Sequence, residues 1–323
     1  MTSVNRAVEA NLRRAEALAE KAAKQGAQLA LLPELFAAGF ELNEHAWETA
    51  EPQGGGIERW LCGTARRLNL YIGGSYLEAR RGDFYDTFVL ASPQGMVAGR
   101  VGKRHPCSIE AYIFKAAKGR QAIETELGRI GVMICYDSSL REVADAVIEE
   151  GADILLLPFS APTPPKSLFH TQRKIDAYHA SFRDGATQYA RLLGIPAVMA
   201  NKSGPWETTL PGFWPAQRST FPGFSHIADS DGRELCRLGN DEGVIVAEVT
   251  LAPDRKPKRL PPERDKWKPW LGPVPFEFRL FAPIEALGRR WYGAGTRSIG
   301  DREHDQPHLR QAAAAQHPLR VTI

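Results

Sequence analysis

Residues 130–141 read IGVMICYDSSLR, a short apolar run that ends at Cys135 and passes into a helical pattern. The run has the length and the Val and Ile content of a β-strand. Ser139 and Glu142 have the spacing of a capping box, which predicts that a helix starts there. Cys135 is therefore expected on a turn from strand to helix, where backbone N–H groups favour a thiolate and can hold an oxyanion. A buried structural cysteine is the alternative interpretation of this position.

Apolar runs of strand length alternate with helical patterns on both sides of this segment. Helical periodicity occurs at 4–25, 56–68, 138–150 and 173–193. Strand-like runs occur at 29–33, 71–77, 87–92, 96–101, 129–136, 152–158, 195–200, 225–228 and 243–251. Turn-forming residues at 93–95 and 229–232 indicate hairpins. Helices that alternate with crossover strands and hairpins predict an α/β fold with a mixed sheet covered by helices.

The composition excludes several classes of function for the whole protein. The chain has 323 residues, 43% of them hydrophobic and 24% charged, and its 41 Lys and Arg nearly balance 38 Asp and Glu, which argues against a polybasic nucleic-acid binder. No C-x-x-C pair occurs, which disfavours a zinc ribbon; the cysteines are Cys62, Cys107, Cys135 and Cys236. No apolar run approaches the roughly 18 residues of a membrane span, and the charges in the first 25 residues disfavour a signal peptide. We therefore expect a cytoplasmic protein that binds neither nucleic acid nor membranes.

The composition changes near residue 252, which we interpret as a domain boundary. Residues 253–323 carry 14 Lys and Arg against 8 Asp and Glu, and they are rich in proline and aromatic residues. We interpret residues 1–252 as the main domain and residues 253–323 as a C-terminal extension packed on it or on a partner subunit. His304 and His308 have the spacing of metal ligands but lie in this extension, and we expect no metal site.

Two further charged residues follow predicted strands. Glu34 comes directly after the run at 29–33, and Lys103 lies in GKRHP, residues 102–106, after another run. Ligand sites of α/β sheets lie at the carboxyl ends of the strands, so both are candidate site residues. Taken singly, each is also compatible with a solvated charge on a loop.

Together these positions match a known pattern. LLPELF at 31–36, GKRH at 102–105 and GVMICYD at 131–137 resemble the acid, lysine and nucleophile motifs of the nitrilase, or carbon–nitrogen hydrolase, superfamily. The separations of 69 and then 32 residues between the glutamate, the lysine and the cysteine suit that family. NKSG at 201–204 and FPGFSHIADSDG at 221–232 resemble its later motifs.

The resemblance covers roughly residues 5–252 and implies a four-layer αββα sandwich that usually pairs with a second copy as a homodimer. Members of the family usually open with a strand before the first helix. Here the chain starts almost at the helix predicted for 4–25, so the first strand is expected to be short or missing. Loss of a central strand would leave the edge of its neighbour unpaired.

The resemblance also implies roles for the site residues. Cys135 would attack an amide carbon and form a thioester, with Glu34 as the general base. Lys103 and the backbone N–H of Tyr136 would hold the oxyanion, and Lys103 would lower the pKa of the Cys135 thiol. Glu110, seven residues after Lys103, would orient the lysine or assist catalysis. No cofactor is implied.

The substrate is the least determined part of this interpretation. Tyr136-Asp137 follows the nucleophile where true nitrilases usually have Trp-Glu, which is more like amidases and carbamoyl-amide hydrolases. The leading hypothesis is hydrolysis of a small linear amide. An N-carbamoyl amide hydrolase, a nitrilase, an acyl transferase and a catalytically silent interaction protein with the same fold are the alternatives. Loops at the carboxyl ends of the strands supply the candidates for a substrate pocket suited to an apolar acyl group: Phe40, Tyr112, Phe159, Ser160 and Trp206.

Overall fold

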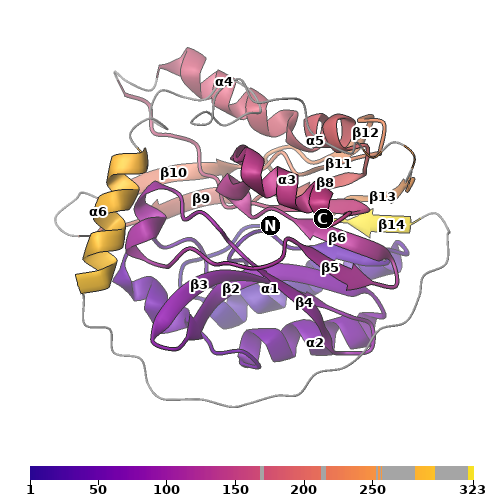
Figure 1. The fold of residues 1–323 in the computed structure, drawn as a ribbon, viewed down its shortest axis with the longest axis horizontal. Helices are drawn as coiled ribbons and strands as arrows, with labels where there is room; N and C mark the ends of the chain where they lie inside the picture. Colours follow the sequence, from indigo (N-terminus) through magenta and orange to yellow (C-terminus); the bar gives the residue numbers. More distant parts are fainter. Residues whose placement is uncertain (168–170, 212–215, 252–253, 255, 257–280, 295–318) are drawn as a thin grey trace.

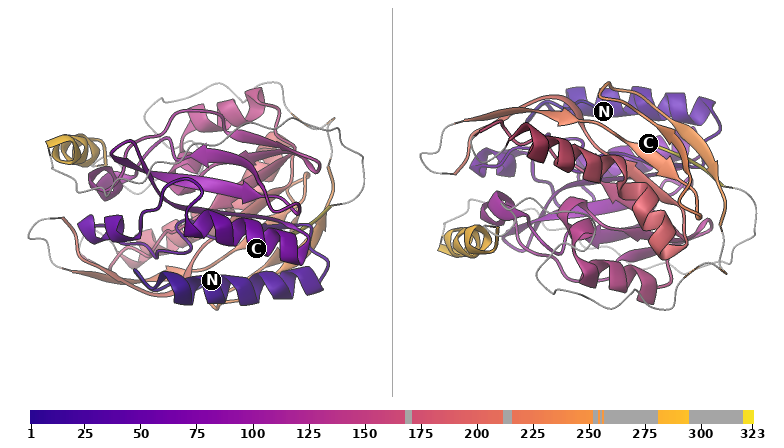
Figure 2. Two further views of the ribbon diagram at one scale, coloured as in Figure 1. Left: turned by 90° about the horizontal axis from the view of Figure 1, so that it is seen from below. Right: turned by 90° about the horizontal axis from the view of Figure 1, so that it is seen from above.

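Two six-stranded sheets lie face to face at the centre of the computed structural model, with helices on their outer faces (Figure 1). Figure 2 shows the same layers from below and from above. The structure describes residues 1–323 except 168–170, 212–215, 252–253, 255, 257–280 and 295–318, so His304 and His308 lie outside the described residues. This arrangement of two sheets between helices confirms the predicted fold class.

The first sheet has the order β13, β14, β1, β2, β3, β4. Its strands are β13 (Val246–Val249), β14 (Leu319–Thr322), β1 (Leu29–Leu31), β2 (Tyr71–Arg80), β3 (Asp83–Ala91) and β4 (Val97–Gly102). Strands β2, β3 and β4 form an antiparallel meander, whereas β1 runs parallel to β2. The outer face is covered by α1 (Val8–Lys24) and α2 (Gly56–Leu68), which contribute apolar side chains such as Ala15 and Leu61.

The second sheet has the order β12, β11, β8, β7, β6, β5. Its strands are β12 (Glu234–Arg237), β11 (His226–Ala228), β8 (Ala197–Ala200), β7 (Ile154–Pro158), β6 (Gly128–Val132) and β5 (Ala122–Thr125). Its helices are α3 (Arg141–Glu149), α4 (Gln172–Arg183) and α5 (Gly185–Leu193). Leu140 is the N-cap of α3 and no side chain caps it, so the capping box predicted at Ser139 and Glu142 is wrong. The reason is that a separate helical turn already occupies Cys135–Ser139.

The burial of each strand depends on whether one or both of its faces are covered. Every residue of β7 is buried, because this central parallel strand has the other sheet on one face and helices on the other. The side chains of β3 also alternate between the two faces of their sheet. Phe88 and Leu90 pack between the sheets, whereas Val89 and Ala91 pack beneath α1 and α2.

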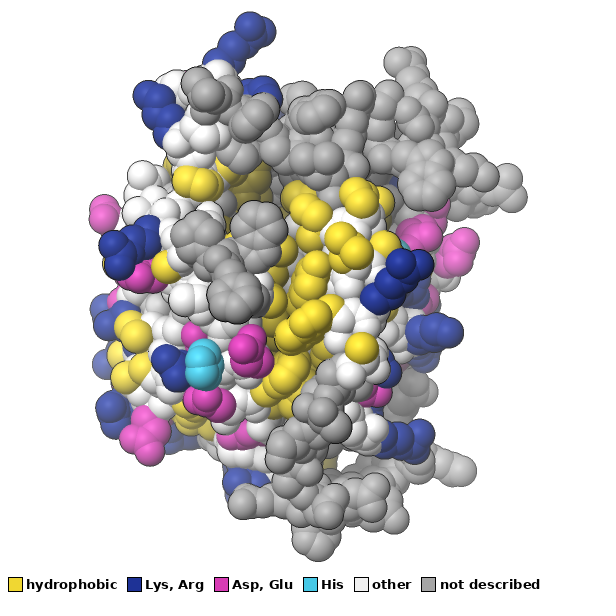
Figure 3. Space-filling model, turned by 90° about the vertical axis from the view of Figure 1, so that its left-hand side faces the viewer, with side chains coloured by type: hydrophobic (Ala, Val, Ile, Leu, Met, Phe, Trp, Pro, Cys, Tyr) yellow, Lys and Arg dark blue, Asp and Glu magenta, His cyan; other side chains and the backbone are white. Residues whose placement is uncertain are grey.

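Short elements surround the ends of the strands that carry the candidate residues. They are the hairpin of β9 (Ser203–Thr208) and β10 (Gln217–Pro222), and the turns η1 (Glu44–Thr49), η2 (Ser108–Tyr112) and η3 (Cys135–Ser139). Helix α6 (Phe281–Ala294) packs against η2 so closely that a Cβ atom at Gly288 would lie 2.7 Å from the Tyr112 ring. Hydrophobic side chains gather on this face of the molecule (Figure 3), where Trp291 of α6 is 41% exposed. Among the described residues, no helix has the length and apolar character to cross a membrane.

Strand β14 fills the position beside β1 that the sequence left open. It runs parallel to β1, with Val321 opposite Leu29, and antiparallel to β13. The unpaired edge expected beside β1 is therefore not found, because residues 319–322 from the C-terminal extension supply the neighbouring strand. The boundary at residue 252 remains a prediction about the sequence, since β14 and α6 both pack on the preceding domain.

Replacing Val321 tests whether β14 belongs to the core. Val321 has no exposed surface and packs between the two sheets. Val321→Ala should lower the free energy of unfolding by about 2 kcal/mol, because it removes buried methyl groups and leaves a cavity. Arg320→Ala is the matched control on the same strand, with its side chain half exposed, and should change stability by less than about 0.5 kcal/mol. Equal urea midpoints for the two variants would contradict the placement of β14.

Candidate active site

The ends of three strands bring Glu34, Lys103 and Cys135 together. Glu34 follows β1 and Lys103 follows β4 in the first sheet, while Cys135 follows β6 in the facing sheet. Lys103 Nζ lies 2.7 Å from Glu34 Oε1. A thiolate at Cys135 raises the pKa of Lys103. Glu34 raises the pKa of the Cys135 thiol and Lys103 lowers it. The three side chains therefore form one electrostatic unit.

Glu110 is the second carboxylate that contacts Lys103. Its Oε2 lies 2.6 Å from Lys103 Nζ and also accepts a 2.6 Å hydrogen bond from the N–H of Cys107, which holds it in the turn η2. Glu34 and Lys103 have no exposed surface, and Glu110 is 3% exposed. Burial raises the pKa of Glu110 to about 7, although the positive charge of Lys103 opposes this rise.

Lys103 remains a cation in this buried position. Burial by itself lowers the pKa of its ammonium group, but the carboxylates of Glu110 and Glu34 outweigh that effect and leave the pKa well above its ordinary value. The ring of Phe114 lies 5.6 Å from Nζ and presents a further surface that favours a cation. A fixed positive charge therefore lies beside the cysteine.

Cys135 sits on a strained turn and is protonated at rest. Its φ angle is 49°, a left-handed conformation that costs a residue with a side chain, and Ser138 Oγ donates a 2.6 Å hydrogen bond to its carbonyl oxygen. Burial raises the pKa of the Cys135 thiol well above its ordinary value, Glu34 raises it further, and Lys103 opposes both. Lys103 lowers this pKa, as predicted, but burial outweighs the single cation, so a net lowering is not found. The helix α3, the predicted source of a further favourable dipole, begins only at Arg141.

Asp137 links the loop after β6, which carries Cys135, to the loop after β4, which carries Lys103. This role was not predicted from the sequence. Its two carboxylate oxygens accept 2.9 Å hydrogen bonds from the backbone N–H groups of Arg104 and His105, which directly follow Lys103. Burial raises the pKa of Asp137 to about 7, while these N–H groups and Lys103 act in the opposite direction. The signal available in the sequence was its position two residues after the cysteine.

Three of the predicted pocket residues lie beside the Glu34 loop. Ser160 Oγ donates a 2.7 Å hydrogen bond to the carbonyl oxygen of Glu34. Trp206 Nε1 donates a 2.7 Å hydrogen bond to the carbonyl oxygen of Phe40, and the two rings lie 5.9 Å apart. Leu35, the residue after Glu34, belongs to the same apolar cluster.

The other predicted pocket residues have different surroundings. Tyr112 lies in η2, and its ring is 5.7 Å from that of Trp291 in α6. Tyr136, the proposed source of an oxyanion N–H, has its ring 5.9 Å from that of Phe281 in the same helix. Phe159 belongs to the cluster between the second sheet and its helices. Helix α6 therefore covers the loops that carry the site.

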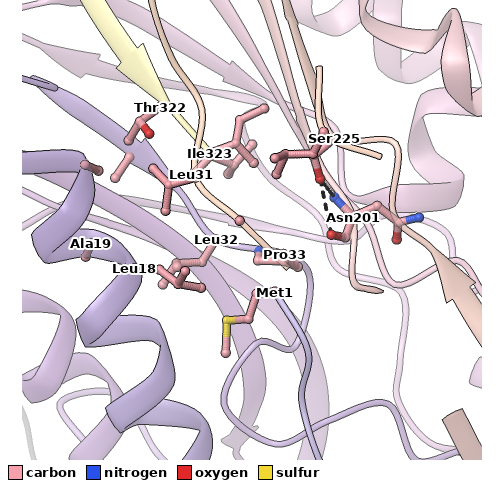
Figure 4. Close-up of a pocket in the computed structure, with 15 residues that line it drawn as sticks. Met1, Leu18, Ala19, Leu31, Leu32, Pro33, Asn201, Ser225, Thr322 and Ile323 are labelled. Carbon is pink, nitrogen blue, oxygen red and sulfur yellow. Dashed lines mark hydrogen bonds between the residues drawn. The ribbon is translucent and has the colours of Figure 1, made fainter. Parts of the chain in front are cut away.

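A pocket beside β1 is separate from this site (Figure 4). Its wall is mostly apolar and includes Leu18, Leu31 and Ile323. On one side, the N–H of Asn201 donates a 2.9 Å hydrogen bond to Ser225 Oγ. The glutamate, lysine and cysteine described above do not line it, so we do not assign the chemistry to this pocket.

Comparison with known sequences points to one family. The model of the carbon–nitrogen hydrolase family matches residues 1–253. An omega-amidase of Danio rerio is 30% identical, over 75% of this chain and 83% of its own length. A nitrilase of Pyrococcus abyssi is 33% identical over 159 residues, which are 48% of this chain and 60% of that protein.

Solved structures share the fold. A carbon–nitrogen hydrolase from Helicobacter pylori superimposes with a TM-score of 0.64 at 20% identity, over 75% of this chain and 83% of its own. A mutant of an amidase from Nesterenkonia AN1 gives a TM-score of 0.62 at 22% identity, over 75% and 85% of the two chains. A further structure of that amidase carries the acetamide moiety of fluoroacetamide on its active-site cysteine.

Removing one acceptor from Asp137 tests its contribution to the site. In Asp137→Asn the amide group can accept only one of the two loop N–H bonds, so we expect a loss of about 2 kcal/mol in the free energy of unfolding at pH 8. Denaturation in urea measures this loss. Asp145→Asn on α3, whose side chain is 39% exposed, is the control and should change stability by less than about 0.5 kcal/mol. Unchanged stability of Asp137→Asn would exclude the tie between the two loops.

Proposed function

We propose, because the chain belongs to the carbon–nitrogen hydrolase family, that it hydrolyses a carbon–nitrogen bond of a small linear amide through a thioester on Cys135. One observation carries the proposal: a buried lysine, bridged by two carboxylates, lies beside a partly buried cysteine where the two sheets meet. An interaction protein needs none of these buried charges, whose removal from water is costly. The cysteine adduct in the similar Nesterenkonia amidase supports the same chemistry.

The raised pKa of the Cys135 thiol makes Glu34 the proposed general base. Glu34 takes the thiol proton as Sγ attacks the carbonyl carbon of the amide, so the new C–S bond forms while the C=O bond opens to an oxyanion. Lys103 and the backbone N–H of Tyr136 stabilise that oxyanion. Glu34 then gives the proton to the leaving amine, the C–N bond breaks, and the thioester remains.

The second half of the reaction reverses the proton transfer. Glu34 removes a proton from water, and the resulting hydroxide adds to the thioester carbon through a second oxyanion. Collapse of this intermediate breaks the C–S bond, and the proton on Glu34 returns to the Cys135 thiolate. The acid leaves and the thiol is regenerated. Glu110 holds Lys103 in place throughout, through the contact of 2.6 Å.

An amide with an apolar acyl group fits the proposed pocket best. Phe40 and Trp206 lie next to the Glu34 loop, and Tyr112 follows Glu110 in η2. We include Ser160, which is hydrogen-bonded to the backbone of Glu34, and Phe159 beside it as the opposite wall. The homodimer and the cytoplasmic location remain predictions, and the mass of the purified protein in solution tests the former.

Ammonia release from a panel of small amides, nitriles and ureido acids tests the proposed reaction. The wild type should release ammonia from at least one simple amide, and Cys135→Ala should lower kcat by about a thousandfold or more, because it removes the nucleophile. Cys236→Ala, on β12 away from the site, is the control and should keep full activity. Full activity of Cys135→Ala would refute the mechanism, and release confined to nitriles or ureido acids would refute the amide as substrate.

The pH dependence tests the role of Glu110. An acid that must be ionised supports activity above its pKa, so kcat/KM should fall as the pH drops through about 7, where Glu110 takes up a proton. Glu110→Gln should lower kcat, because the amide pairs with Lys103 without a charge, and should remove this acidic limb. Glu124→Gln on β5 is the control and should keep the wild-type profile. An acidic limb that persists in Glu110→Gln would assign it to another group.

A further inference from the structure

Asp86 is a third carboxyl group beside the catalytic lysine, and the proposed reaction does not use it. It lies in β3 with no exposed surface. Its side chain lies next to Ser75 and Glu34, and the charge of Lys103 acts on its pKa. Both of its carboxyl oxygens, and Oε2 of Glu34, are buried without a conventional donor among the described residues. Buried oxygens of this kind require an explanation.

The charges around Lys103 do not balance if every carboxyl group is ionised. Glu34, Glu110 and Asp86 would place three buried anions around one ammonium group. The other buried lysine near this cluster, Lys202, donates to the carbonyl oxygen of Leu35 at 3.2 Å. Burial lowers its pKa to about 7, so it does not supply a full second charge. An uncompensated buried carboxylate costs far more than a protonated one, so one of the three retains a proton.

The hydrogen-bond geometry assigns that proton to Asp86. Glu34 already has Lys103 Nζ on Oε1 at 2.7 Å, and Glu110 has the same Nζ at 2.6 Å, whereas Asp86 has no ion pair of this kind within the described part of the chain. Two carboxylates in contact only repel, but a carboxylic acid can donate to a carboxylate. The side chain of Ser75 accepts the N–H of Leu35 at 2.9 Å; its influence on Asp86 lowers the pKa of that carboxyl group, but burial outweighs it.

We propose that Asp86 is a positioning residue, protonated at neutral pH, which donates a hydrogen bond to Oε2 of Glu34 and so orients the general base. The proposal rests on the proposed function in one respect, the role of Glu34 as that base. Oε1 then faces Lys103 and Oε2 faces Asp86, so rotation of the carboxylate is blocked from both sides. Burial and the charge of Glu34 raise the pKa of Asp86 and outweigh the opposite effects of Lys103 and Ser75, which agrees with this assignment.

The first test uses Asp86→Asn and needs no substrate. An amide has the shape of the acid, donates the same hydrogen bond and is always neutral. If Asp86 is already neutral, the rate of Cys135 alkylation by iodoacetamide should depend on pH as in the wild type. If Asp86 is ionised, the substitution removes a buried anion near Glu34, Lys103 and Cys135. The midpoint of the alkylation rate against pH should then move down by about one pH unit or more. Such a shift would overturn the proposal.

The second test separates positioning from packing. Asp86→Ala removes the donor to Glu34, so kcat should fall about 10- to 100-fold with little change in KM, while Asp86→Asn should retain at least about a third of the wild-type kcat. Asp83→Asn, at the start of the same strand, is the matched control for an Asp-to-Asn change. Equal loss of kcat in the Asn and Ala variants would show that the donor is not what matters.

These tests separate the proposal from the proposed function. If no amide is hydrolysed by the wild type, the proposed function fails, yet the Cys135 alkylation profile still reports the protonation state of Asp86. If Asp86→Ala does not fold, Asp86→Asn with its alkylation profile still decides the question. Infrared spectra give an independent reading, since the difference between wild type and Asp86→Asn at pH 7 should contain the carbonyl band of one protonated carboxylic acid. Identical spectra would overturn the assignment.

Discussion

The buried ammonium group of Lys103 is the constraint on which the rest of the site depends. Taking such a charge out of water costs several kcal/mol unless carboxylates lie close enough to compensate. Glu34 at 2.7 Å and Glu110 at 2.6 Å provide that compensation. Burial and the charge of Glu34 raise the pKa of the Cys135 thiol, so the proposed reaction needs a base, and we propose Glu34 for that role.

The loops that carry these charges are themselves held by buried polar side chains. Asp137 accepts the N–H groups that follow Lys103, Ser160 donates to the carbonyl oxygen of Glu34, and Glu110 accepts the N–H of its own turn. Helix α6 adds a contact from outside, because Glu285 accepts a 3.2 Å hydrogen bond from the N–H of Ser108. Backbone groups of buried loops need such partners, and here the partners also hold the loops that carry Glu34, Lys103 and Cys135.

The pattern of elements followed from the sequence wherever the signal was local. Apolar runs of strand length and helical periodicity predicted the α/β layers, and β7 shows why, since a strand covered on both faces reads as an unbroken apolar run. The edge beside β1 was predicted incorrectly for a different reason. The strand that pairs with β1 at this edge contains Val321, almost 300 residues further along the chain. A local sequence pattern cannot predict a pairing over that distance.

The sequence by itself determined the fold class, the family resemblance and the three residues Glu34, Lys103 and Cys135, because these depend on short motifs and on their order along the chain. Only the tertiary structure decided the direction of the cysteine pKa shift, the tie made by Asp137 and the place of Asp86 beside Glu34. Each of these depends on burial and on contacts between separate strands. A residue's surroundings in the folded chain, rather than its neighbours in sequence, set the cost of its charge.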